Sequence, residues 1–130
     1  MTTVDEAPFE RLGGEAGVRR LVDHFYDRMD QRPDCAPIRA MHPADLASSR
    51  DKLAWFLTGW LGGPPVYVQR FGHPRLRARH LPFAIDDAAR DQWMSCMREA
   101  LAATITADEP LRAHLELTLS RLADHMRNRP

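Results

Sequence analysis

A histidine at the end of a basic run has the surroundings in this chain that most suggest chemistry. Residues 75–80 read RLRARH, and Pro82 follows. A solvated basic helix, a phosphate-binding stripe and a metal ligand at His80 all fit these residues. As a ligand, His80 would bind metal through one neutral ring nitrogen while the other donated to a backbone carbonyl. Spacing alone does not choose among the three interpretations.

Three polar side chains fall on helix faces whose apolar pattern points inward: Tyr26, Ser49 and Trp93. Buried polar atoms need partners, and a helical bundle that turns hydroxyl and indole groups inward often encloses something polar. Plainer interpretations stay open, with Tyr26 bonded to a core carbonyl and Trp93 serving only as packing. His42, before a proline, is equally well placed as a loop residue with its ring in water.

The elements that would position these residues are all helical. Apolar residues recur at helical spacing between the prolines, and no segment alternates as a strand does, so the predicted fold class is all-α. We expect Asp45 and either Asp86 or Asp87 to cap helices, and Pro74 to open one. Residues 66–73 are expected to be irregular or a marginal helical turn. After a short turn over 9–12, the predicted helices are 15–30, 45–61, 74–80, 87–104 and 110–127.

The cysteines do not suggest a disulfide scaffold, because there are only two, Cys35 and Cys96. Cys96 lies one turn after Trp93 and is expected to be a small core residue. Prolines 33 and 37 force an irregular connection through Cys35, whose thiol is a candidate for reactivity.

Length and composition narrow the class of protein. The 130 residues, 44% of them hydrophobic, predict one globular domain over 1–130, with a flexible tail over 1–8. Eighteen Lys and Arg balance 18 Asp and Glu, which argues against a nucleic-acid partner. The longest apolar run, 53–57, is too short to span a membrane, and residues 1–10 lack the apolar core of a secretory signal. We therefore expect a cytoplasmic protein with no membrane partner and reduced thiols.

Two stretches carry a family resemblance. From Trp60 the chain reads WLGGPPVY, and from Phe71 it reads FGHPRLRARHLPF. Together with Phe25-Tyr26 and the DQW of 91–93, this pattern resembles the group II truncated haemoglobins over nearly the whole chain. The resemblance implies a truncated globin, a two-over-two helical sandwich around haem b. The apolar-poor stretch 62–86 would then wrap the haem.

Matching positions imply a role for each site residue. His80 would be the proximal iron ligand, on one face of the haem. Tyr26, Trp93 and His42 would be hydrogen-bond donors on the distal face, and Ser49 would stand at the ligand gate. Lys52 would pair with a propionate, Leu53, Phe56 and Trp60 would pack on the haem, Tyr67, His73, Arg77 and Arg79 would lie near its edge, and Phe83 and Ile85 would line the proximal side.

The implied function is binding of oxygen, carbon monoxide and nitric oxide. Bound oxygen gains negative charge, and donors aimed at that charge slow its release, which argues against bulk transport. Sensing or redox chemistry with nitric oxide or peroxide is favoured, with an unidentified reductase as electron donor. A monomer and a homodimer are both compatible with the sequence. The alternatives are an anion sensor with ligand entry beside Ser49, and a helical binding module that has lost haem and offers the basic stripe 70–79 to an acidic partner.

Overall fold

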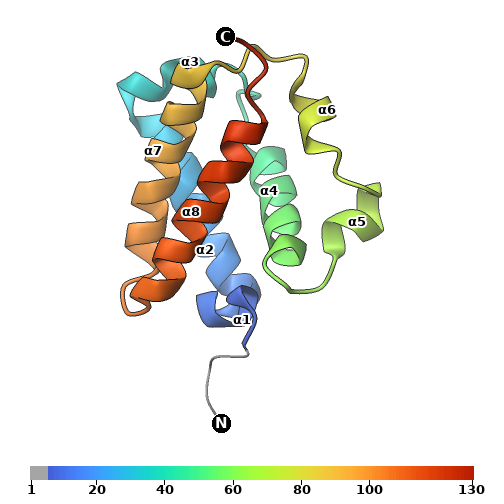
Figure 1. Cartoon of the computed structure of the whole chain (residues 1–130), viewed down its shortest axis with the longest axis vertical. Coiled ribbons are helices and arrows are strands. Elements are labelled where there is room, and N and C mark those ends of the chain that lie inside the picture. Colours follow the sequence, from blue (N-terminus) through green and yellow to red (C-terminus); the bar gives the residue numbers. More distant parts are fainter. Residues whose placement is uncertain (1–5) are drawn as a thin grey trace.

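The structure is a computed structural model that describes residues 6–130 (Figure 1). These residues form helices and connections with no strand, which confirms the all-α prediction. None of their helices is long and apolar enough to cross a membrane. Most of the predicted tail, residues 1–5, lies outside the described residues, and Pro8 already belongs to the first helix. The elements are α1 (Pro8–Leu12), α2 (Gly14–Gln31), η2 (Pro33–Cys35), α3 (Ala36–Arg39), α4 (Ala47–Trp60), α5 (Val66–Phe71), α6 (Leu76–His80), α7 (Asp87–Thr104) and α8 (Glu109–His125).

The core lies among the four long helices α2, α4, α7 and α8. Helix α2 packs most extensively against α7 and also against α4, and α8 packs against α7. The apolar stripe of α2 is buried, and its side chains belong to the same core cluster as those of α4, α7 and α8. Gly17 lets α1 approach α2, since a Cβ there would lie 2.1 Å from the Leu12 carbonyl oxygen.

Helices α5 and α6 lie apart from this core, on the side of α4 that faces away from α7 (Figure 1). Residues 66–71, predicted to be irregular or marginal, are helical. The helix is stabilised by packing rather than by length, because Tyr67 is buried with its ring against Phe56 of α4, at 6.2 Å between centroids. Aromatic contact with α4 thus supplies what a six-residue helix lacks on its own.

Helix starts depart from the predictions in small, explicable ways. Pro74 does not open α6, because Arg75 adopts a left-handed conformation (φ 48°) and the helix begins at Leu76. Helix α4 begins at Ala47, whose backbone N–H donates to the Asp45 carboxylate at 2.9 Å. Asp86 caps α7 as predicted.

The last helix and the proline-rich connection also differ from expectation. Helix α8 begins at Glu109, one residue before Pro110, because the Asp108 carboxylate accepts from the backbone N–H of Leu111. The connection over 33–44, expected to be irregular, contains the short helices η2 and α3. Both start at or next to a proline, a residue that fits the first helical turn.

Candidate functional site

His80 is the last residue of α6, and its ring is partly buried. Its Nδ1 lies 2.5 Å from the carbonyl oxygen of Leu76, one turn earlier. A carbonyl can only accept, so Nδ1 carries the proton and Nε2 keeps its lone pair. This is the tautomer that an imidazole needs in order to bind a metal through Nε2.

Four rings from three parts of the chain form a continuous distal cluster. Phe25 lies edge-on to Tyr26 at 4.9 Å and to Trp93 at 5.0 Å between ring centroids. Tyr26 in turn lies edge-on to His42 at 5.7 Å. The structure therefore brings together all three residues that the resemblance assigns as distal donors, with Phe25 as their common packing partner.

The Tyr26 ring is buried at 6% exposure, and burial raises the pKa of its hydroxyl, while the positive charge of Arg50 lowers it. The net shift is upward, so the hydroxyl stays protonated and can donate. Among residues 6–130, neither this hydroxyl nor the Trp93 indole N–H has a hydrogen-bond partner, and both atoms keep some solvent exposure. Both donors are therefore free to serve a ligand.

His42 is positioned on the same site by its own backbone bond. Its Nδ1 lies 2.8 Å from the Ile38 carbonyl oxygen, which leaves Nε2 unprotonated in the neutral ring. Burial lowers the pKa of His42, and the positive charge of Arg39 lowers it further against the opposing effect of the Ile38 bond. In the neutral ring His42 therefore offers Nε2 as an acceptor, and not as the donor that the resemblance implies.

Exposed apolar side chains are concentrated in the part of the chain around His80. Among the described residues, five of the six large hydrophobic side chains that are exposed come from the 60–83 stretch. Exposed apolar groups concentrated in this way are candidates for a binding surface. Leu53, Phe56, Ile85 and Trp93 are partly buried and pack against the core. The five exposed side chains are Trp60, Val68, Phe71, Leu81 and Phe83.

These residues fit a haem group. No cluster of three or more His, Cys, Asp or Glu side chains that could hold a metal ion is found in residues 6–130. His80 would supply the axial nitrogen, the exposed apolar side chains of 60–83 would suit a porphyrin, and the unengaged donors of Tyr26 and Trp93 would suit a polar ligand on the iron. The chemistry of the donor set therefore agrees with the resemblance.

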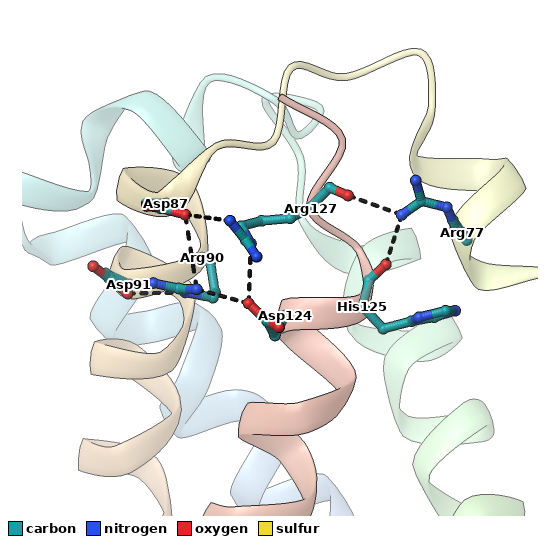
Figure 2. Close-up of polar contacts among 7 residues, drawn as sticks. All are labelled: Arg77, Asp87, Arg90, Asp91, Asp124, His125 and Arg127. Carbon is teal, nitrogen blue, oxygen red and sulfur yellow. Dashed lines mark hydrogen bonds and ion pairs between the residues drawn. The ribbon is translucent and has the colours of Figure 1, made fainter. Parts of the chain in front are cut away.

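Lys52, expected to pair with a propionate, is exposed, and Ser49, expected at the ligand gate, is half-buried. Of the residues expected at the haem edge, His73 and Arg77 are engaged by other parts of the chain. The Nδ1 of His73 accepts the backbone N–H of Arg75 at 3.0 Å, so it serves the turn before α6. Arg77 donates to the carbonyl oxygens of residues 125 and 127, both at 2.8 Å, and is committed to α8 rather than to the site (Figure 2).

Arg79 and Tyr67 stay together at the edge. The Arg79 guanidinium lies over the Tyr67 ring at 5.9 Å from its centroid. Arg79 also donates from Nε to the Pro74 carbonyl oxygen at 2.7 Å, which leaves its terminal nitrogens available. Of the basic residues in this stretch, Arg79 is therefore better placed than Arg77 to meet an anionic group.

The expectation of a reactive Cys35 gains no support. Cys35 and Cys96 are both fully buried, with their Sγ atoms 3.2 Å apart. Burial raises the pKa of Cys96 to about 12, so this thiol is not ionised at pH 7. Cys96 is a core residue as predicted. Cys35 is a free cysteine like Cys96 and forms a hydrogen bond with it inside the core.

Sequence reasoning missed two residues of the site. Arg50 lies over the Tyr26 ring at 5.8 Å and donates to Asp23 and Asp27 of α2. Asn128 donates to the His80 carbonyl oxygen at 3.1 Å. No local sequence pattern marks either residue, because each makes its contacts with residues that are 23 or more positions away in the chain.

Comparisons with known proteins place the chain among globins. Residues 7–128 match the family model "Bacterial-like globin". The Group 2 truncated hemoglobin YjbI of Bacillus subtilis is 43% identical over 94% of this chain and 89% of its own length. The group II 2-on-2 hemoglobin of Agrobacterium tumefaciens superposes with a TM-score of 0.93 at 45% identity, over the full length of both chains. The truncated oxygen-avid haemoglobin of Bacillus subtilis superposes with a TM-score of 0.85 at 41% identity, over 95% of this chain and all of that one.

Proposed function

Because the chain belongs to the bacterial-like globin family, and within it to the group II truncated haemoglobins, we propose that it binds haem b and holds diatomic gases tightly in a hydrogen-bonding pocket. Haem-based gas binding follows from the family. The haem type, the ligands and the roles of individual residues are our proposal. The observation that carries it is the His80 ring, whose Nδ1 is held by the Leu76 carbonyl so that Nε2 of the neutral ring is available for iron. The unengaged donors of Tyr26 and Trp93, which share Phe25 as a packing partner, support it.

On the proximal side, His80 would hold the iron. When bound, haem supplies a ferrous iron that takes up oxygen, carbon monoxide or nitric oxide. The Leu76 carbonyl fixes the proton on Nδ1, which orients the ring and makes Nε2 more basic. Phe83 and Ile85 follow His80 along the chain and would cover the proximal face, with Arg79 and Lys52 as candidates for the propionates.

On the distal side, Tyr26 and Trp93 would donate to the ligand. Oxygen gains negative charge when it binds, and a hydrogen bond to a charged group contributes about 1.5–3 kcal/mol. At about 1.4 kcal/mol per tenfold, one such bond slows oxygen release by roughly tenfold to a hundredfold. His42 contributes as a third polar group, with Ser49 at the entrance. Tight binding argues against bulk transport, and the relative described as oxygen-avid supports this proposal.

A pocket that retains oxygen suits redox chemistry or sensing. Nitric oxide and oxygen can become nitrate when one electron is supplied, and distal donors also polarise the bond between two oxygen atoms, as peroxide reduction requires. Both reactions need an external reductant or reductase. We therefore propose nitric oxide dioxygenation or a peroxidase-like reaction as side activities of a cytoplasmic monomer or homodimer.

Oxygen release tests the proposal directly. The oxygen complex is mixed with excess carbon monoxide, and the exchange is followed in the Soret band. Tyr26→Phe removes the hydroxyl and should speed oxygen release by at least tenfold. The control is Tyr67→Phe, the other tyrosine, which should leave the rate within twofold. Equal rates in wild type and Tyr26→Phe would remove Tyr26 from its distal role.

The alternative without haem loses much of its basis. It needs the arginines of the stripe 70–79 to be free for an acidic partner. Arg70 instead lies over the Trp55 ring at 4.2 Å, and Arg77 binds two backbone carbonyls. Two of the four arginines in the stripe are therefore used within the chain.

A further inference from the structure

The helix that ends at His80 is poorly supported by its own residues. Helix α6 has five residues, and none of them is buried. Helices of this length are not stable in isolation, because nucleation costs more than one or two backbone bonds return. Arg75, directly before it, is held in a left-handed conformation that non-glycine residues rarely adopt. Another part of the chain must therefore hold α6 in place.

The C-terminal segment 125–129 supplies that support. Asn128 Nδ2 donates to the carbonyl oxygens of His80 at 3.1 Å and Phe83 at 3.0 Å. Its Oδ1 accepts the backbone N–H of Ile85 at 2.9 Å. The backbone N–H groups of Asn128 and Arg129 both donate to the Ile85 carbonyl oxygen. One asparagine thus joins three points of the connection from 80 to 85.

Arg77 makes the matching contact on the other side of His80. Its Nη1 donates to the carbonyl oxygens of His125 and Arg127, both at 2.8 Å (Figure 2). These oxygens lie at and just after the end of α8, where carbonyls lack helical partners. A guanidinium carries several fixed donors and suits two acceptors at once. Segment 125–129 therefore holds the chain both three residues before His80 and after it.

The same segment is anchored to the core. Arg127 donates to Asp87 at 2.8 Å and to Asp124 at 3.0 Å, and Arg90 donates to Asp124 at 2.7 Å (Figure 2). Asp87 and Arg90 lie in the first turn of α7, the helix that carries Trp93. Position is thus transmitted from the packed helices α7 and α8 to α6 through hydrogen bonds.

We propose that segment 125–129 is a clamp that sets the position of the proximal histidine, with Asn128 as its main positioning residue. This inference rests on the proposed function, since the clamp acts on haem only through His80. An amide offers two donors and an acceptor, and all three are used here. Aspartate has the same shape but no donors, so it would set a carboxylate against two carbonyl oxygens.

Asn128→Ala and Asn128→Asp test the clamp in the haem-loaded protein. The readouts are haemin transfer to excess apomyoglobin and the iron–imidazole stretching band in resonance Raman spectra of the ferrous form. Both variants should release haemin about tenfold faster, which corresponds to the loss of one or two net hydrogen bonds, and both should shift the band. Arg77→Gln should act in the same direction and replaces either variant if that variant fails to fold.

Arg129→Ala is the matched control. The Arg129 side chain donates only to the Asn128 carbonyl oxygen, so this variant keeps the anchor of the segment and every bond between the segment and residues 77–85. Its band and haemin release should match those of wild type. Wild-type behaviour of Asn128→Asp and Arg77→Gln would overturn the clamp. An equal change in Arg129→Ala would also overturn it, because the effect would then not depend on the bonds to residues 77–85. A wild-type protein that takes up no haem would instead contradict the proposed function.

Discussion

Tyr26 and Trp93 belong to 18-residue helices packed in the core, whereas His80 ends a five-residue helix with no buried side chain. The distal residues are placed by burial, because Phe25, fully buried, contacts both of them. His80 is placed by hydrogen bonds that its helix and the residues after it make with the end of α8 and the segment that follows α8. The two faces of the proposed haem site thus depend on different forces.

This difference implies different responses to change. Close-packed side chains resist local movement, so distal geometry should change only when the core itself is damaged. Elements with few buried apolar contacts open locally at low cost. We therefore expect substitutions on the distal side to affect stability or ligand release, and those on the proximal side to affect haem retention.

The largest expected effect is that of His80→Ala. Loss of the axial nitrogen should abolish tight haem binding, measured as haemin transfer at least a hundredfold faster than in wild type. His73→Ala is the control, because His73 is exposed in the same stretch and bonds only to the turn before α6. Retention of haem by His80→Ala, with the iron–imidazole band intact, would refute the proximal assignment.

Removing one aromatic ring from each face should show that burial matters more for the distal side than for the proximal side. Phe25→Ala should lower the free energy of unfolding by about 3–5 kcal/mol, because it leaves a cavity in the core. Phe83 is 40% exposed, so Phe83→Ala should cost less than half as much while still speeding haemin release. Urea unfolding followed by circular dichroism measures both. Equal costs would show that the proximal face is packed as tightly as the distal face.

Trp93→Phe sharpens the distal assignment. It removes the indole N–H but keeps an aromatic ring, so oxygen release should be severalfold faster with little change in haemin release. Trp55→Phe is the control, because Trp55 lies against Arg70 and Phe71, away from the distal cluster. If haemin release changes more than oxygen release does, Trp93 serves packing rather than ligand binding.

The smallest expected effect is on the stability of the fold at acid pH. A hydrogen bond from Arg90, and then the charge of Arg127, lowers the pKa of Asp124 below that of an unfolded chain, about 3.9. Its contribution to stability is therefore present above about pH 4 and is lost as the pH falls through the lowered value. Asp124→Asn should reduce the drop in melting temperature between about pH 5 and pH 2. An unchanged drop would show that this exposed network does not stabilise the fold.

The sequence predicted the long helices well, because their apolar spacing is strong, and 87–104 matches α7 residue for residue. It did not predict α5, whose stability comes from aromatic contact with α4, or the start of α6, which depends on one left-handed residue. The distal cluster of Tyr26, Trp93 and His42 was assigned through a family motif. The role of Asn128 was not predicted, because its hydrogen-bond partners lie 43–48 residues away and no local sequence pattern marks them.

We propose that this chain joins a packed distal pocket to a clamped histidine around haem. The visible absorption spectrum of the purified protein in the ferric, reduced and carbon monoxide forms tests this proposal. We predict a Soret band that shifts through the three states, with the iron held by a single histidine in the reduced form. A colourless protein that takes up no added haemin would contradict the claim.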